Sequence, residues 1–289
     1  SMVNLTIDGQ QVSVEPGTTI LKAARSIGID IPTLCNYKDF TPEGSCRMCL
    51  VEVVGARRLE TSCSTPAAEG MVVNTNTAEV RKARRFVLKM LMSDHTFDCM
   101  TCYKYGCCDF VEFNANCIEY DAVKEFGTER VMTKPIDDSN PFYTYDPNKC
   151  VLCNRCIKVC EHLQCNHILA QCDRGYETNI NPVFEIPRGK SECVSCGNCL
   201  AACPTGALAP KQFKPFAYAK TVQTVCPYCG VGCTLNLKII DNKITDIYST
   251  EGNVNDNLLC VKGRFAYDFV SSPDRLTTPL IRKNGVLEE

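Results

Sequence analysis

Apolar and polar positions alternate in two short runs near the start of the chain, VNLTI at 3–7 and QQVSV at 10–14. A period of two is typical of strands with one buried face, and Asp8-Gly9 between the runs favours a hairpin turn. Beyond this hairpin, apolar residues recur at helical spacing up to about Ile27. The pattern predicts a short helix there, capped by Thr18 or Thr19.

Residues 78–93, AEVRKARRFVLKMLMS, predict a longer amphipathic helix. Its Lys and Arg residues are expected to form a solvated face. Its apolar side is expected to consist of Val80, Phe86, Val87, Met90 and Leu91. Further strands are expected at 49–55, 235–240 and 244–249, with the last two joined around Asp241-Asn242.

Residues 121–149 hold three prolines and several aromatic residues. This composition indicates a linker, which we expect to pack onto the next module through Tyr143 and Tyr145. The residues expected to form the small hairpin core of that module are Ile168, Ile180, Val183 and Ile186.

Cysteine content changes the picture, because 23 of the 289 residues are Cys and none is Trp. So many cysteines indicate either disulfides or metal sites. We find no signal peptide and no twin-arginine leader, so we expect a cytoplasmic protein, and a reducing cytoplasm favours metal. No run of 18 apolar residues predicts a membrane span. The formal charge of −2 indicates no nucleic-acid partner.

The strongest chemical pattern is the spacing C-x2-C-x2-C-x3-C, which occurs twice. The first run consists of Cys150, Cys153, Cys156 and Cys160, and the second of Cys193, Cys196, Cys199 and Cys203. This pattern resembles the two-cluster bacterial ferredoxins, in which the fourth Cys of each run binds the other cluster. The resemblance implies one [4Fe-4S] cluster on Cys150, Cys153, Cys156 and Cys203. It implies a second on Cys193, Cys196, Cys199 and Cys160. Paired zinc sites are the alternative.

An earlier set is spaced C-x10-C-x2-C-x13-C and consists of Cys35, Cys46, Cys49 and Cys63. Gly44 and Ser45 suit a loop that approaches inorganic sulfide closely. The set resembles the N-terminal [2Fe-2S] domain of the large iron-sulfur subunit of respiratory complex I. The same domain occurs in iron-iron hydrogenases and NAD-linked formate dehydrogenases. A four-cysteine zinc site is the alternative.

A third set follows the long helix, with the spacing H-x3-C-x2-C-x5-C, and consists of His95, Cys99, Cys102 and Cys108. It resembles the complex I module that binds a [4Fe-4S] cluster through one His and three Cys. On that resemblance His95 is a ligand, although a His at a helix end is often structural. Cys107 is then a spare thiol. The residues that match no motif are Cys117, His162, Cys165, His167 and Cys172.

The last set is spaced C-x2-C-x3-C-x26-C and consists of Cys226, Cys229, Cys233 and Cys260. With the VKGR run at 261–264, it resembles the N-terminal [4Fe-4S] segment of molybdopterin-dependent formate dehydrogenases. In that family a Lys after the last Cys lies between cluster and pterin. The resemblance makes Lys262 a candidate for relaying electrons.

No dinucleotide motif and no separate His/Asp/Ser set appears, and the pterin domains of the family are not in the sequence. We therefore expect no catalytic residue in this chain. Molybdopterin, with molybdenum or tungsten, is expected only in a full-length relative or a partner. The expected cofactors are one [2Fe-2S] and four [4Fe-4S] clusters, with iron as the metal.

These patterns predict an α+β, multi-domain iron-sulfur protein. The expected parts are a β-grasp [2Fe-2S] ferredoxin at 2–80, a helical [4Fe-4S] module with one His ligand at 81–120, a linker at 121–149, a bacterial-type double-[4Fe-4S] ferredoxin at 150–215 and a small β-rich [4Fe-4S] segment at 216–289.

Three functions remain open. The chain could carry electrons between a formate dehydrogenase catalytic site and a flavin-containing, NAD(P)-binding diaphorase-type partner. It could be a short subunit that joins a diaphorase to a hydrogenase or another oxidoreductase. It could also be a zinc-stabilised scaffold without a redox role.

Overall fold

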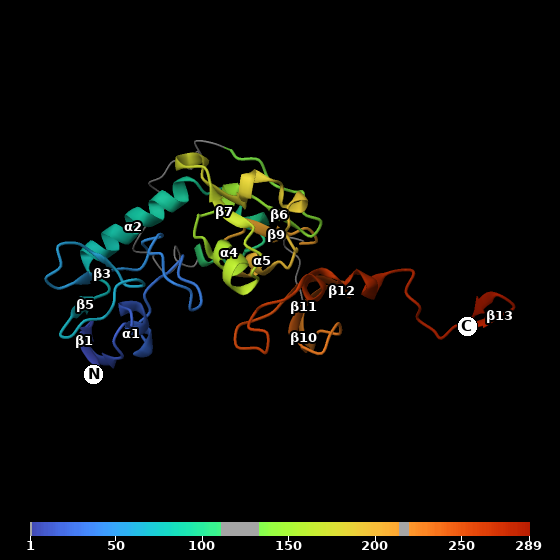
Figure 1. Cartoon of the computed structure of the whole chain (residues 1–289), viewed down its shortest axis with the longest axis horizontal. Coiled ribbons are helices and arrows are strands. Elements are labelled where there is room, and N and C mark those ends of the chain that lie inside the picture. The colour runs from blue at the N-terminus through green and yellow to red at the C-terminus, as the bar shows by residue number, and fades with distance from the viewer. Residues whose placement is uncertain (1, 111–132, 214–219) are drawn as a thin grey trace.

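A computed structural model describes residues 2–110, 133–213 and 220–289. The N-terminal sheet, the long helix α2, the central double-cysteine module and the C-terminal strands follow one another across the molecule (Figure 1). Cys117 and the other expectations that fall on 111–132 lie outside the described residues. The mixed helix and strand content agrees with the predicted α+β class.

The N-terminal part is a five-stranded sheet in the order β2-β1-β5-β3-β4. Its strands are β1 (Val3–Ile7), β2 (Gln10–Val14), β3 (Leu50–Val53), β4 (Glu60–Thr61) and β5 (Val72–Asn74). The predicted hairpin is confirmed, since β1 and β2 pair antiparallel from Val3 to Ile7. The predicted short helix is α1 (Ile20–Ser26), whose Lys22 N–H donates to the Thr19 hydroxyl at its start. The apolar side of α1 covers the sheet and completes one core with β1 and β3.

Helix α2 (Ala78–Ser93) has the predicted bounds, but its buried face differs from the predicted one. Phe86 and Met90 are 63% and 52% exposed, so their assignment to the buried side was wrong. The buried residues are Val80, Arg84, Leu88 and Met92. Arg84 was expected in solvent; its guanidinium instead donates to the Leu50 carbonyl at 2.7 Å, which offsets the cost of burial.

The central module is built from two short hairpin-like pairs and two short helices. Strand β6 (Tyr143–Tyr145) pairs with β9 (Leu208–Pro210), and β7 (Leu169–Cys172) pairs with β8 (Asn179–Pro182). The helices are α4 (Arg155–Lys158), which continues as the π-helical η4 (Val159–Leu163), and α5 (Asn198–Ala202). The tyrosines at 143 and 145, expected to pack from a linker, are buried strand residues of this module.

The core of the central module is only partly the predicted one. Ile180 is buried and Ile168 packs against the core. Val183 and Ile186 are 48% and 40% exposed, so their assignment to the core was wrong. They lie beyond the last residue of β8, in and after the 3₁₀ turn η6 (Val183–Glu185), where the alternation of the strand no longer holds.

The C-terminal part is a three-stranded antiparallel sheet in the order β10-β11-β12. The predicted strands are β11 (Thr234–Ile240) and β12 (Lys243–Tyr248), joined at Asp241-Asn242 as expected. Strand β10 (Lys220–Val225) was not predicted. Helix α6 (Val261–Phe265) follows, and the distal hairpin β13 (Ile281–Lys283) and β14 (Val286–Glu288) lies farthest from the N-terminal sheet (Figure 1).

Short 3₁₀ turns complete the described structure: η1 (Cys99–Thr101), η3 (Pro147–Lys149), η5 (Gly175–Glu177), η7 (Arg188–Lys190) and η8 (Asp268–Ser271). In the ranges that the structure describes, no helix combines the length and apolarity that crossing a bilayer requires.

Candidate metal centres

The two cysteine runs of the central module fold alike. In each, the residue two after the first Cys has a φ of 52° (Leu152 and Ser195), and its N–H donates to that Cys Sγ at 3.4 Å. The residue after the second Cys is also left-handed, with φ of 61° at Asn154 and 73° at Gly197. A short helix then begins at once. Both loops therefore turn amide N–H groups toward sulfur, as thiolates that bind a cluster require.

The fourth Cys of the first run faces the second run. One small cavity is lined by four cysteines of the two runs, namely Cys160, Cys193, Cys196 and Cys199. Cys160 lies in the π-helical turn, where Gln164 N–H donates to the Val159 carbonyl at 3.0 Å. In the first run Glu161 follows Cys160, and the helical turn continues through it. In the second run Pro204 follows Cys203, and α5 has already ended. The two runs therefore differ in structure where they differ in sequence, directly after the fourth Cys.

Cys203 acts electrostatically on the first run. Burial raises the pKa of Cys150, and the nearby Cys203 thiolate raises it further. Burial likewise raises the pKa of Cys153, with Cys203 as the next cause. Burial raises the pKa of Cys199 in the second run to about 12, and Cys160 adds to the shift. Each fourth Cys therefore lies near cysteines of the other run, and the crossed ligand sets stay a prediction.

The chemistry of these donor sets would suit iron-sulfur clusters. All cysteines in the described residues are free. In the same residues no three His, Cys, Asp or Glu side chains converge closely enough to hold one metal ion. A cluster differs because its thiolates bind separate irons, so its ligands stand farther apart. Buried thiols with raised pKa values need a cationic partner to ionise, and bound iron would provide one.

The cysteines of the N-terminal part form two pairs. The Cys46 thiol donates to Cys35, which lowers the pKa of Cys35 to about 5, and burial partly opposes this shift. In the same way the Cys63 thiol lowers the pKa of Cys49 to about 6. Gly44 has a φ of 62°, and a Cβ there would lie 3.3 Å from Ser64 Oγ. A [2Fe-2S] cluster takes four thiolates, two for each iron, and these two thiol pairs would provide that number.

His95 lies just beyond the end of α2 and is 7% exposed. Its ring packs against Phe97 and Phe110, with centroids 5.2 and 5.1 Å apart. Cys99 begins the 3₁₀ turn η1. Of the two adjacent thiols at 107 and 108, Cys107 is exposed and the other packs against a buried core.

Cys102 connects this set to the central module. A Cβ added to Gly206 would lie 2.1 Å from Cys102 Sγ, so only glycine fits there. Lys149 forms an ion pair of 2.8 Å with Asp98, close to the same thiol. Burial raises the pKa of Cys102, and the positive charge of Lys149 opposes that shift. The third ligand set therefore borders the loop after Cys203.

The C-terminal cysteines gather around the start of α6. Burial raises the pKa of Cys233, and the other three thiols of its set raise it further. A Cβ on Gly263 would lie 3.7 Å from Cys226 Sγ and 4.0 Å from Cys260 Sγ. Lys262, the expected relay residue, is exposed.

Arg264 is a functional candidate that the sequence analysis missed. It is 5% exposed, and its Nε donates to the Cys196 carbonyl at 3.2 Å while its own N–H donates to the Cys260 carbonyl at 3.0 Å. It thereby connects a cysteine of the C-terminal set with one of the central module. Its position two residues after Lys262 could have indicated this, since residues i and i+2 of a helix face different directions.

The N-terminal part also contacts the central module. One buried core contains Cys35, Leu88, Phe110 and Cys153, which come from three different ligand regions. Arg155 Nε donates to the Leu34 carbonyl at 2.6 Å, and Lys158 Nζ donates to the Thr41 carbonyl at 2.7 Å. The loop around Cys35 is thus fixed against α4.

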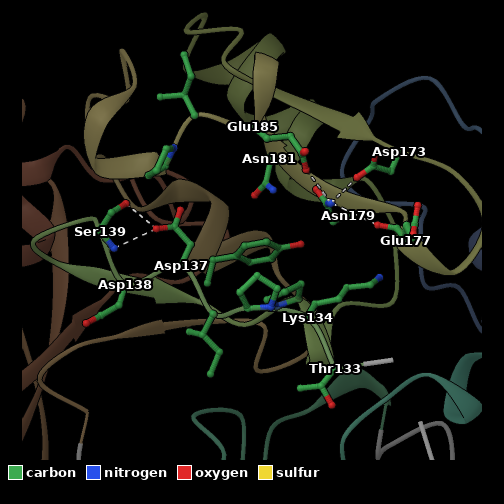
Figure 2. A pocket seen from close by; sticks show the side chains of 16 residues that line it. Thr133, Lys134, Asp137, Asp138, Ser139, Asp173, Glu177, Asn179, Asn181 and Glu185 are labelled. Atoms are coloured by element: carbon green, nitrogen blue, oxygen red, sulfur yellow. Dashed lines mark hydrogen bonds between the residues drawn. The ribbon is translucent and has the colours of Figure 1, made fainter. Parts of the chain in front are cut away.

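A groove of about 660 Å³ opens beside the central module (Figure 2). It is lined by both polar and apolar side chains, and Asn179 Nδ2 donates to Asp173 and Glu185 across it. At the other side, Asp137 accepts hydrogen bonds from the N–H and the hydroxyl of Ser139.

Comparison with known proteins supports these assignments at the level of domains. Residues 1–78 match the 2Fe-2S iron-sulfur cluster binding domain, 188–209 match the 4Fe-4S binding domain and 219–272 match the molybdopterin oxidoreductase Fe4S4 domain. The chain is an iron-sulfur protein with a molybdopterin oxidoreductase Fe4S4 domain. In this iron-sulfur protein the 2Fe-2S match comes first along the chain, and the Fe4S4 match at 219–272 comes last.

Its curated relatives are redox proteins. The chain is 38% identical over 99% of its length to a subunit of the NADH-quinone oxidoreductase of Rhizobium meliloti. It is 37% identical over 97% of its length to the alpha subunit of NADPH-Fe(3+) oxidoreductase of Geobacter sulfurreducens. It is 31% identical over 99% of its length to a putative formate dehydrogenase of Staphylococcus aureus. The chain spans about a third of the length of these relatives, 34%, 33% and 33% respectively.

A solved structure has a similar fold. The match is a chain of an NAD+-reducing [NiFe]-hydrogenase in the H2-reduced state, with a TM-score of 0.65 and 28% identity. The similarity covers 75% of the present chain and 90% of the hydrogenase chain.

Proposed function

We propose that the chain is an iron-sulfur electron relay between a formate dehydrogenase-type catalytic site and a flavin-containing, NAD(P)-linked partner. The observation that carries the proposal is the continuity of contacts between ligand sets. Cys35 and Cys153 share one core, Cys102 abuts Gly206, and Arg264 joins Cys196 to Cys260. An electron relay needs neighbouring clusters at fixed separations. These contacts between the ligand sets would fix those separations.

The proposed ligand sets are those expected from the sequence, with one [2Fe-2S] and four [4Fe-4S] clusters. The proposed parts are likewise 2–80, 81–120, 121–149, 150–215 and 216–289, with Tyr143–Tyr145 joining the fourth part through β6. When bound, the clusters supply one-electron transfer. The thiolates and His95 hold the iron, the buried cores exclude water, and the amide N–H groups of Leu152 and Ser195 stabilise charge on sulfur.

The names of the relatives support the assignment of partners. They include a putative formate dehydrogenase and oxidoreductases named for NADH and NADPH. The Fe4S4 domain at 219–272 favours a molybdopterin-dependent catalytic partner or domain. Lys262 is exposed on α6 and is proposed to face it. We propose the cytoplasm as the location, because free thiols and iron ligation suit a reducing compartment.

One observation favours a second function. The solved chain of an NAD+-reducing [NiFe]-hydrogenase is matched over 90% of its own length and over 75% of the present chain. The chain could in that case link a diaphorase to a hydrogenase or another oxidoreductase. Mass spectrometry of the native complex discriminates the two: a natural 289-residue chain would favour the short subunit, and a longer chain with pterin would favour the first proposal.

The test of the relay itself is a metal analysis of anaerobically purified protein. One [2Fe-2S] and four [4Fe-4S] clusters give about 18 iron atoms per chain, an equal amount of acid-labile sulfide and no zinc. Dithionite should bleach the brown colour. A colourless protein with stoichiometric zinc and little iron would instead establish a zinc scaffold and end the proposal.

A further inference from the structure

Among the charged side chains in the described part of the chain, Arg188 is the most completely buried, and the ligand sets leave its role unexplained. It is 1% exposed in the 3₁₀ turn η7, within the central module. Its Nη2 donates to the Ile180 carbonyl, and its guanidinium lies over the Tyr145 ring at 4.1 Å. Within the described ranges its Nε and Nη1 make no hydrogen bond. A buried cation with so few partners is costly unless negative charge lies nearby.

The nearest carboxylate compensates this charge only in part. Asp137 Oδ2 lies 3.9 Å from Arg188 Nε, which is too far for a hydrogen bond. The carboxylate instead accepts the backbone N–H of Arg188 at 2.9 Å. It also accepts both donors of Ser139, as Figure 2 shows. Burial would raise its pKa, but these hydrogen bonds outweigh burial and lower it. Asp137 therefore stays charged and is directed mainly at backbone donors.

The remaining negative charge near Arg188 belongs to both cysteine runs. Two residues that its guanidinium contacts, Ile180 and Tyr145, belong to the same core as Cys156 and Cys199. Burial would lower the pKa of Arg188, but the negative charges around it, with Cys199 first and Cys156 among the others, raise it. Cys156 and Cys199 are the third cysteines of the two runs and so hold equivalent places in the repeat. One guanidinium thus lies within electrostatic reach of both ligand sets.

We propose that Arg188 is a positioned cation, shared by both [4Fe-4S] clusters of the central module, that makes each of them easier to reduce. The inference rests on the proposed relay. Reduction adds one negative charge to a cluster, and a fixed positive charge in a poorly hydrated interior stabilises the reduced form more than the oxidised form. Because one residue acts on both clusters, it raises both potentials together and keeps the electron shared within the pair.

The test is a redox titration of the whole chain, followed by EPR, for Arg188→Met and Arg188→Lys. Met removes the charge at similar length, so the potentials of both module clusters should become more negative. The expected size is about a tenfold change in the reduced-to-oxidised ratio at fixed potential, or 59 mV for one electron. Lys should keep values near those of the unmodified protein. Arg174→Met, at an exposed Arg of the same module, is the matched control and should shift neither cluster.

A second variant should shift the reduction potentials of both clusters in the opposite direction. Asp137→Asn removes the negative charge beside Arg188, so both potentials should become more positive. This variant also decides the matter if Met at position 188 prevents cluster assembly. Unchanged potentials in Arg188→Met and Asp137→Asn chains with full iron content would overturn the role of Arg188 and leave the relay intact. Absence of clusters from the unmodified protein would refute the relay itself.

Discussion

Gly197→Ala gives the sharpest test of how the C-terminal part is held on the central module. Gly197 precedes α5 with a φ of 73°, and a Cβ there would lie 2.4 Å from Arg264 Cδ and 2.8 Å from Phe265 Cζ. Both neighbours belong to α6, and Phe265 stacks on Phe142 with ring centroids 5.1 Å apart. Alanine therefore forces the Arg264 and Phe265 side chains away from the module.

The cost to docking comes from moving Arg264. A left-handed backbone also disfavours alanine by about 1 kcal/mol, but this strain lies in the central module and remains when α6 is released, so it does not add to the loss. Moving Arg264 breaks its hydrogen bonds to the Cys196 carbonyl, at 3.2 Å, and to Asn198 Oδ1, at 3.3 Å. Hydrogen bonds from a charged donor contribute about 1.5–3 kcal/mol each, of which we take about 2 kcal/mol in all because the side chain can regain water. The expected loss of docking free energy is about 2 kcal/mol, or about 30-fold in the opening equilibrium.

Hydrogen–deuterium exchange of the cluster-loaded protein measures this opening locally. Amides of 259–267, including those of Leu259 and Arg264 that are hydrogen-bonded in the structure, should exchange about 30-fold faster in Gly197→Ala. Exchange in β1 and β2 should stay the same. Unchanged protection at 259–267 in a correctly loaded variant would refute the reasoning.

Two controls separate backbone strain from the steric contact. Gly175→Ala also places alanine at a positive φ, 62°, but meets no atom within 4 Å, so it should leave 259–267 protected. Gly197→Asn uses the residue that occupies the equivalent place in the first run, Asn154 at φ 61°. Asn tolerates that backbone. It should still expose 259–267, because its larger side chain meets Arg264.

Further predictions concern the ligands. Cys203→Ser should damage the cluster of the first run, and EPR of the reduced protein should retain the signal of the cluster on Cys193, Cys196 and Cys199; loss of that signal instead would contradict the crossed arrangement. His95→Ala should change one [4Fe-4S] signal only, and an unchanged spectrum would mean that His95 is not a ligand. Removing iron with a chelator under anaerobic conditions should unfold 150–215, seen as loss of amide protection in β7 and β8, because so small a core depends on its metal; retained protection would show that the module folds without clusters.

Local signals in the sequence were enough to predict the elements with strong periodicity. The hairpin at Asp8-Gly9, the cap at Thr19 and the bounds of α2 all follow from residues within one or two turns of one another. The cysteine spacing was equally local and indicated the kind of domain that the comparisons then matched.

Burial that depends on distant segments could not be predicted in this way. Phe86 looked like a core residue of α2, yet the sheet packs on the face that carries Arg84, because the Leu50 carbonyl accepts from that guanidinium. Strand β10 has little apolar pattern and exists through its pairing with β11. Arg188 has no sequence motif at all, since its surroundings are assembled from segments around 137, 145 and 180.

The VKGR run shows how one short helix can serve two neighbours. Cys260, a proposed ligand of the C-terminal set, directly precedes α6, and Gly263 lies beside Cys226 and Cys260. Arg264 turns inward and reaches the Cys196 carbonyl, while Lys262 remains exposed on another face. Residues two apart on a helix cannot face the same way. If the relay operates as proposed, Arg264 fixes the connection to the central module and leaves Lys262 available to the catalytic side. The four residues at 261–264 would then influence both the step by which electrons reach the C-terminal cluster and the step by which they leave it.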